Sequence, residues 1–493
     1  MSTAQGSFLQ RLPLELRWHI LESISDVRSL ASAALTCRAL YSAFKAKEDD
    51  LPSAVLANCV GHEVLREAEI VHQCCPPFLS TPVRTTSPVG EPLDAEQSRQ
   101  VHLYAKGFIR HLKRRTVPTP RRWNMSYALA FADYHLRVVV PLTQAFVEAC
   151  ASEQLSFPCV DLDDSLRARP ATRREEERVM RALYRFELFR KLFGRYSDGI
   201  EHMPGGAVAV PYAHNFFKRF APWEIAQLAV IHDFLGQQVM PAFADIAEHD
   251  IQWAAFAVNF NTPWNRRVDH PAIQHLLTLG LQQILRIASC YTFKSRIREV
   301  LGRTENVTVE NHLFFDVALR FSDGLDRTTH GKRLLHGKPF HVDGDTGPRT
   351  LWTMTLGADR SPFYDSRDWL DRRWGYVMWD CERLRELGVL DHAWSRADAP
   401  EQGLPLESIT WTLEQRRKLW HQGGRGYWAL YDESRVVYPN GRCAFETKET
   451  ENTESTEADT MTVTITEKQS TSDTNATRGR SWFRRMARRI LRR

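Results

Sequence analysis

The sequence predicts a mainly α-helical protein with an N-terminal three-helix unit, a large helical body and a disordered C-terminal tail. Three observations carry this prediction. Apolar residues recur at helical spacing through most of the chain, and alternating strand patterns are nearly absent. The 493 residues are 43% hydrophobic and 25% charged, which is ordinary for a globular protein that buries a core. The region after residue 445 has instead the composition of a chain that cannot bury enough apolar surface to fold.

The N-terminal segment "LPLELRWHIL" predicts a helix with two apolar faces. Pro13 stands at the expected first helical position, where its missing amide hydrogen costs nothing. At 100° per residue the apolar side chains form two groups: Leu14, Trp18 and Leu21 in one, and Leu16, Ile20 and Ile24 in the other. A helix that faces one core shows a single stripe. The second group therefore predicts that this helix also contacts a partner.

A second helix is expected after "SDVRSL", where Ser25 or Asp26 offers an N-cap. Its buried face follows the i, i+3, i+4, i+7 spacing through Leu30, Ala33, Ala34, Cys37, Leu40, Tyr41 and Phe44. The charged run "KAKEDDLP" closes this unit, which we place at residues 9–50. About forty residues is close to the size below which a helical unit struggles to stand alone. A partner is the natural remedy.

Residues 51–120 are expected to form a partly irregular connecting region, with a helix near residues 101–113, and residues 121–445 to form the helical body. The strongest helix signal begins at Thr172, because Thr172 and Glu175 have the spacing of a capping box and Gly194 marks a stop. Its apolar stripe consists of Val179, Ala182, Leu183, Phe186, Phe189 and Phe193. Further helices are expected over residues 221–235, 271–301, 372–388 and 413–421.

The C-terminal region divides into two segments of opposite charge. Residues 446–479 are rich in threonine and acidic residues, and we expect a disordered acidic tether. Residues 480–493 hold seven arginines and no acid, so the positive charge of the chain is concentrated there. A helical wheel separates two faces: Trp482, Phe483, Met486 and Ile490 on one, and Arg484, Arg485, Arg488 and Arg492 opposite, with Arg489 adding to the basic character. This pattern fits an anionic membrane surface, a calmodulin target or a nuclear import patch.

No spacing in the chain indicates an enzyme, so we expect no catalytic, cofactor-binding or metal-binding residue. "GLDRTTHGKR" lacks the interval and the Ser/Thr of a phosphate-binding loop. Asp343 and Asp345 in "HVDGDTG" lack the further ligands of a calcium loop, which favours a surface turn, and "DLDD" at residues 161–164 needs no cation. The histidines on or beside helices are expected to be satisfied core residues: His214, His232, His270 and His275. The nine cysteines form no C-x-x-C pair, which fits a reducing compartment without a zinc or disulfide framework.

The N-terminal unit resembles the F-box, the adaptor-docking module of cullin-based ubiquitin ligases. The resemblance rests on Leu12-Pro13-x-Glu15-Leu16, Ile20-Leu21, Leu30 and the run from Leu35 to Tyr41. It covers about a tenth of the chain. The sequence departs from the family pattern at Leu35, where valine is usual, and at Leu40 and Tyr41, where a Trp or Phe is commoner.

This resemblance implies a substrate-recognition subunit of an SCF-type ubiquitin ligase that binds a Skp-type adaptor, a cullin scaffold and a protein target, and no specific nucleic acid. The residues implied at or behind the adaptor interface are Leu12, Pro13, Leu16, Ile20, Leu21, Leu30, Leu35 and Cys37. The alternative is a structural or membrane-associated interaction protein with an F-box-like helical cap. The N-terminus shows no secretory signal, so we expect a cytoplasmic or nuclear protein, or one held at a membrane surface by its tail.

The body is similar to the long C-terminal regions of many fungal F-box proteins, through the segments "RALYRFELFRKLF", "FAPWEIAQLAVIHDFL" and "YVMWDCERLRELGVL". This second resemblance brings no chemistry. It implies that a set of bulky or charged residues are structural markers of one helical fold: Tyr184, Phe186, Trp223, Glu224 and Trp379.

If the basic tail binds membranes, deletion of residues 480–493 abolishes binding to anionic vesicles and leaves the helical content unchanged. Each basic residue near an anionic surface contributes on the order of 1 kcal/mol, so the loss is measurable by vesicle co-sedimentation. Neutral vesicles serve as the control. Undiminished sedimentation of the truncated chain with anionic vesicles rules out the tail as an anchor.

Overall fold

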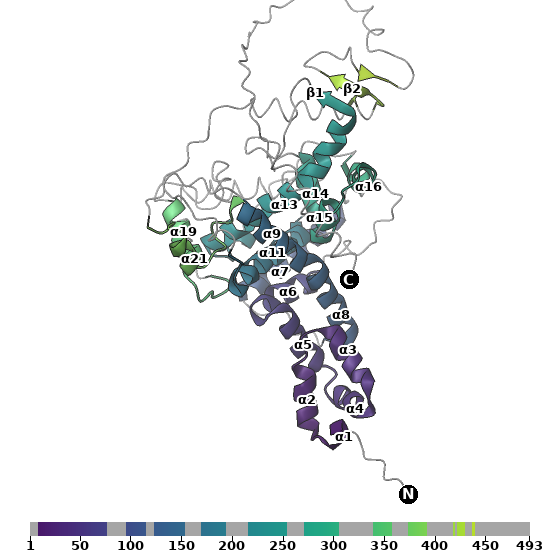
Figure 1. The fold of residues 1–493 in the computed structure, drawn as a ribbon, viewed down its shortest axis with the longest axis vertical. Helices are drawn as coiled ribbons and strands as arrows, with labels where there is room; N and C mark the ends of the chain where they lie inside the picture. The colour runs from purple at the N-terminus through teal and green to yellow at the C-terminus, as the bar shows by residue number, and fades with distance from the viewer. Residues whose placement is uncertain are drawn as a thin grey trace, which may run out of the picture.

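The computed structural model describes residues 8–75, 95–114, 123–152, 169–193, 215–253, 271–304, 339–356 and 373–391, and short pieces at 418–419, 422–428 and 436–438. These parts of the chain are mainly helical, as the sequence predicts. The N-terminal helices form a narrow end, and the remaining helices pack into a wider body around helix α11 (Figure 1).

The narrow end contains α1 (Phe8–Arg11), α2 (Leu14–Glu22), α3 (Val27–Thr36) and α4 (Arg38–Ala46). Pro13 directly precedes α2. Asp26 is the N-cap of α3, and the Ser29 N–H donates to its Oδ1 at 2.8 Å. Hydrogen bonding with the Ser29 side chain, and then with the Ser29 backbone, lowers the pKa of this carboxyl. The buried helix face expected from Leu30 to Phe44 does not belong to one helix. Cys37 is extended (φ −156°) and separates α3 from α4.

Two helices connect the narrow end to the body, in a region that was expected to be partly irregular. Helix α5 (Leu51–Val60) and helix α6 (His62–Gln73) meet at Gly61, whose φ of 90° favours glycine. Helix α5 packs against α2 and α3 on one side and α8 on the other. Helix α7 (Ala95–Arg114) extends the helix expected near residues 101–113. The domain boundaries drawn from the sequence remain predictions.

Helix α11 (Arg173–Phe193) lies at the centre of the body and begins as predicted. The Thr172 N–H donates to Glu175 Oε2 at 2.8 Å, and the Glu175 N–H donates to Thr172 Oγ1 at 3.2 Å, which completes the capping box. All six residues of the predicted apolar stripe are buried. Gly194, the expected stop, lies outside the described residues.

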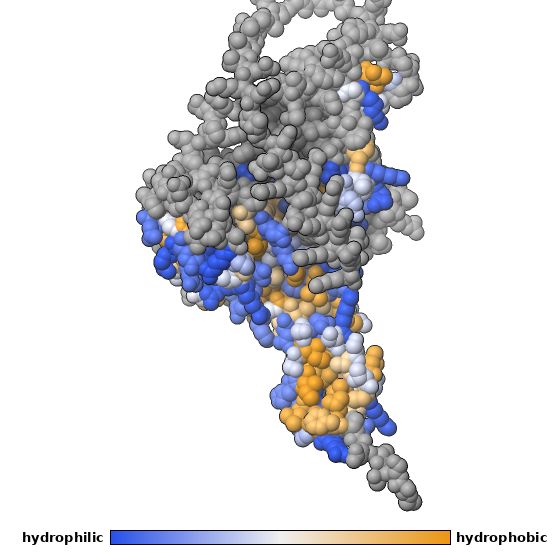
Figure 2. Space-filling model, viewed as in Figure 1, coloured by the Kyte–Doolittle hydropathy of each residue, from blue (hydrophilic) through white to orange (hydrophobic). Residues whose placement is uncertain are grey.

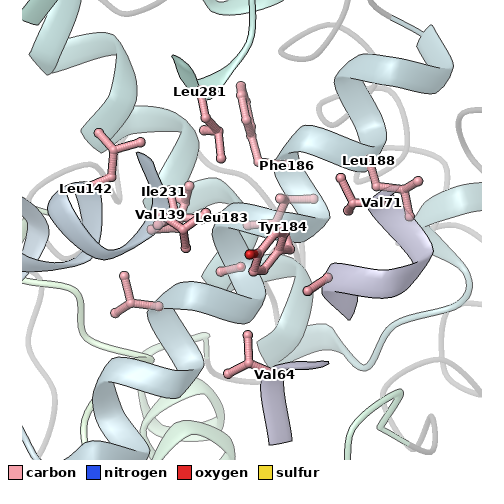
Figure 3. Packing of buried hydrophobic residues seen from close by; sticks show 14 of the residues in the cluster. Val64, Val71, Val139, Leu142, Leu183, Tyr184, Phe186, Leu188, Ile231 and Leu281 are labelled. Atoms are coloured by element: carbon pink, nitrogen blue, oxygen red, sulfur yellow. The ribbon is translucent and has the colours of Figure 1, made fainter. Parts of the chain in front are cut away.

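Helix α11 packs against α6, α13 (Pro222–Asp250), the π-helical turn η1 (His135–Val139) and α9 (Val140–Ser152). Helix α8 (Met125–Tyr134) runs directly into η1 and α9. The first residue of α15 (Leu281–Ala288) donates its N–H to Glu187 of α11 at 3.1 Å. Figure 3 shows Leu183 and Tyr184 of α11 among side chains of these helices. One hydrophobic cluster runs from Leu21 in the narrow end to Val389 near the end of the body.

The long helix predicted over residues 271–301 is wrong, because this segment forms α14 (Pro271–Thr278), α15 and α16 (Phe293–Thr304). Gly280, at a φ of 92°, separates α14 from α15. A Cβ at this position would lie 3.0 Å from Arg190 Nε, so the close approach to α11 adds to the preference for glycine that the positive φ sets. Helix α13 extends well beyond the predicted residues 221–235 and contains Pro241.

The C-terminal part of the body is less helical than the sequence predicts. It contains α19 (Gly347–Leu356) and α21 (Cys381–Glu386), so only the end of the helix expected over residues 372–388 forms. Gly375, with a φ of 71° and Phe146 directly beside it, begins a turn instead. Of the helix expected at residues 413–421, the structure describes only Lys418 and Leu419.

A small sheet lies at the far end of α13 (Figure 1). Strand β1 (Ile251–Trp253) pairs in parallel with β2 (Arg425–Trp428), and β2 pairs antiparallel with β3 (Val436–Val437). Within the described ranges, no helix is long and apolar enough to cross a membrane.

Helix α11 also has a charged face that is buried beneath the C-terminal part of the body. The Arg178 side chain is fully buried, and its guanidinium donates to Met378 O (2.7 Å), Asp380 Oδ1 (2.6 Å) and Asp343. Glu175 pairs with Arg383 at 2.8 Å. Asp343 and Asp345, expected in a surface turn, are half-buried, because Asp343 pairs with Arg178 and Asp345 accepts the N–H groups of Gly347 and Cys381.

Replacement of Arg178 by methionine is expected to destabilise the protein by about 3–5 kcal/mol, because it leaves buried carboxylates without their cation. Arg174→Met is the matched control. Arg174 lies one turn earlier, is largely exposed, and its nearest acid is 4.0 Å away, so its loss costs less than about 1 kcal/mol. Urea unfolding followed by circular dichroism measures both. Equal losses of stability in the two variants contradict the role given to Arg178.

Candidate functional site

The strongest candidate site is an exposed apolar surface on the narrow N-terminal end. Leu16 (47%), Ile20 (41%) and Leu35 (77%) keep large fractions of their surface exposed, although all three are hydrophobic. Figure 2 shows apolar residues gathered over this end of the molecule. We call these three side chains, together with the exposed Pro13, the N-terminal apolar face.

Helix α2 has the two-sided character that its sequence predicts. Leu21 is fully buried, and Leu14 and Trp18 pack against the core, whereas Leu16 and Ile20 face outward. Ile24 is the exception to the prediction. It follows the end of α2 and packs against the core instead of joining the outward group, because the chain has already turned toward α3.

The eight residues implied at or behind the adaptor interface divide into three groups by burial. Those exposed are Pro13, Leu16, Ile20 and Leu35; those half-buried are Leu12 and Cys37; and those fully buried are Leu21 and Leu30. The buried pair supports the face from behind. The structure therefore brings part of the implied set to the surface and uses the rest as its foundation.

Two exposed aromatic residues of the same end were missed as surface residues. Tyr41 was expected on a buried helix face, but the break at Cys37 rotates α4 and leaves Tyr41 45% exposed. Phe8 lies on α1 and is 74% exposed. Helix α1 is short and none of its residues is buried, so the sequence shows no apolar periodicity that would predict the exposure of Phe8.

Polar contacts fix α2 on α4 without using the N-terminal apolar face. The Trp18 indole donates to Ala43 O at 2.9 Å, and the Arg17 guanidinium donates to Ala39 O at 3.1 Å. Lys47 Nζ lies 4.4 Å from the centre of the Trp18 ring. The side-chain amide of Asn58 on α5 donates to the carbonyl of Glu22 at the end of α2, at 2.7 Å. The outward residues are thus held on a preformed support.

Charged residues adjoin the N-terminal apolar face along the chain. Glu15 precedes Leu16, His19 precedes Ile20, and Arg38 follows Cys37, and all three are exposed. Their charges are of mixed sign. An apolar centre beside polar and charged residues is the usual arrangement of a protein–protein interface.

Burial shifts the pKa values of several titratable side chains in the part of the chain that the structure describes. Burial raises the pKa of the Cys59 thiol to about 11 and that of Cys74 to about 12, so both stay protonated at neutral pH. Burial lowers the pKa of His135 to about 4, and its Nδ1 lies 2.9 Å from the hydroxyl oxygen of Tyr184. Cys74 and His135 are buried, and Cys59 is half-buried against the hydrophobic cluster.

The histidines expected in the core are buried where the structure describes them. The Nδ1 of His232 lies 3.0 Å from Asp233 Oδ1, its Nε2 lies against the Gln274 amide, and His275 is also buried. His214 and His270 lie outside the described residues. Among the residues with described placement, no group of three or more His, Cys, Asp and Glu side chains could hold a metal ion.

The residues implied as structural markers lie in or against the core. Tyr184, Phe186, Glu224 and Trp379 are buried, and Trp223 packs against the hydrophobic cluster. Three sequence features lie outside the described residues: the segments 161–164 and 324–333, and the C-terminal region 446–493 with its arginine-rich tail.

Comparison with known proteins adds no relative to this picture. The chain matches no protein-family model, no curated protein and no solved structure. The likeness of the N-terminal segment to the F-box therefore rests on the residues of this chain alone.

Proposed function

We propose that this protein is the substrate-recognition subunit of an SCF-type (Skp–cullin–F-box) ubiquitin ligase and performs no chemistry itself. The observation that carries the proposal is the N-terminal apolar face. Leu16, Ile20 and Leu35 are exposed on a segment that resembles the F-box, while Leu21 and Leu30 of the same segment are fully buried. The Skp-type adaptor is the proposed occupant of this face.

The energetics of the face favour a bound partner. Full burial of a leucine or isoleucine side chain stabilises by about 1.5–3 kcal/mol relative to full exposure. Single exposed apolar residues need no explanation, but Leu16 and Ile20 lie one helical turn apart on α2, with Pro13 just before them. A partner that covers this row gains free energy without rearranging the helices beneath it, because those helices are already packed.

The helical body has a different task in this proposal. It binds a protein target, while the adaptor and the cullin scaffold hold the ubiquitin-loading machinery at a fixed distance. Rate enhancement then comes from proximity, which replaces a bimolecular encounter by one within the complex. The continuous hydrophobic cluster from Leu21 to Val389 supports this role, because it leaves no flexible joint between the N-terminal face and the described helices of the body.

The test is co-purification with a Skp-type adaptor. A Leu16→Ala, Ile20→Ala, Leu35→Ala variant is expected to lose at least tenfold in affinity. Each side chain is exposed, so its stability changes little. Leu103→Ala with Leu136→Ala is the matched control, because these two leucines are exposed to a similar degree on other helices. The control is expected to bind like the wild type.

A second comparison separates docking from folding. Leu21→Ala removes a fully buried side chain and is expected to destabilise the protein by about 2–5 kcal/mol. Adaptor binding lost in that variant alone, with the exposed-face variant still bound, contradicts docking through the face. A folded wild-type chain that does not bind the adaptor points instead to a structural or membrane-associated interaction protein.

A further inference from the structure

We propose that residues 339–345 form a latch that holds helix α6 against α11 and so stabilises the helices of the narrow end. This inference concerns the conformation of the chain and does not depend on the proposed ligase function. It rests on a ring of contacts that joins the latch, α13, α11 and α6 through buried charged groups.

The backbone of the latch is held by one buried carboxylate. Glu224 near the start of α13 accepts the Phe340 N–H at 2.7 Å and the His341 N–H at 3.1 Å. It also accepts the Ala221 N–H at 2.8 Å. The two latch amides lie in a segment without helix or strand, so no backbone ladder supplies their acceptors. The Glu224 carboxylate accepts their hydrogen bonds instead.

The same carboxylate is linked to α6 through a buried arginine. Arg185 of α11 donates from Nη2 to Glu224 Oε1 and to Glu67 Oε1 of α6, each at 2.9 Å. All three side chains are nearly fully buried. Both carboxylates accept from the same buried guanidinium, so loss of either removes an acceptor from a donor that water does not reach.

The latch also contacts α6 directly, which closes the ring. The Nε2 atom of His341 lies 3.1 Å from Glu63 Oε2. The guanidinium carbon of Arg66 lies 4.8 Å from the centre of the Phe340 ring, and that of Arg185 lies 5.8 Å from the same centre. Glu63, Arg66 and Glu67 occupy neighbouring positions on one side of α6. Three α6 residues therefore meet either the latch or the arginine that the latch helps to place.

Through this ring, the latch affects the stability of helices outside its own segment. Helix α6 packs on α5, and α5 packs on both α2 and α3. When the latch is lifted, Glu224 loses two donors and Arg185 loses an aromatic neighbour, so α6 loses part of its attachment to α11. Since coupling free energies are reciprocal, the factor by which latch release loosens α6 equals the factor by which loosening of α6 favours latch release.

Hydrogen exchange measured by mass spectrometry on the full chain tests the latch. In Phe340→Ala, the amides of α6 are expected to exchange at least tenfold faster than in the wild type. The amides of α15, which does not belong to the ring, are expected to keep their rates. Val342→Ala is the matched control, since Val342 lies in the same segment with 75% of its surface exposed. It is expected to leave α6 unchanged.

Two results overturn the proposal. In the first, the latch itself exchanges faster in Phe340→Ala while α6 keeps its wild-type rate. In the second, α6 and α15 accelerate equally, which means a general loss of stability. Should Phe340→Ala fail to fold, His341→Ala carries the test, because it removes the contact with Glu63 and leaves the buried Phe340 ring in place. A threefold or greater acceleration confined to α6 supports the latch, and an unchanged α6 refutes it. Adaptor binding plays no part in these measurements, so they fail or succeed independently of the ligase proposal.

Discussion

The guanidinium of Arg178 joins parts of the chain that lie 165 to 202 residues apart, and the C-terminal half of the body is organised around it. Its partners are the carboxylates of Asp343, Asp345 and Asp380 and one carbonyl, from segments that form few helices of their own. Burial of an arginine is costly unless each of its donors finds an acceptor. Arg178 therefore imposes one arrangement on residues 339–347 and 374–383, because any other arrangement leaves a charge unpaired in the core.

Arg185 lies two turns further along α11. It joins α6 to α11 through a buried ion pair, as Arg178 joins the C-terminal segments to α11. Its bond to Glu67 ties α6 to the centre of the body, in addition to the apolar contacts of Val64 and Val71 (Figure 3). Apolar packing alone tolerates sliding between helices, whereas a buried ion pair fixes their register. The combination explains how a narrow helical end can extend from a wide body and still share one core with it.

Local signals in the sequence predicted local structure well. The capping box at Thr172 and Glu175, the cap at Asp26 and the two faces of α2 depend only on residues within a turn or two of each other, and all are present. The breaks at Gly280 and Gly375 were not predictable in this way. Each glycine has a positive φ and lies against a side chain from a distant helix, Arg190 or Phe146. The charged face of α11 was hidden for the same reason, because its acidic partners are far away in the sequence.

The candidate docking surface shows the same division. The outward position of Leu16 and Ile20 follows from helical spacing within α2, and the sequence predicts it. Leu35 lies outside the buried face of α3, whereas Tyr41 is exposed because the extended backbone of Cys37 divides one expected helix into two. Spacing drawn across that break assigns Tyr41 to the buried face, since it assumes a helical residue where the chain is extended. Where a surface spans a helix break, its residues can be identified only from the structure. Within α2 no break intervenes, so helical spacing alone predicts that this helix has a second apolar face, which the core does not cover.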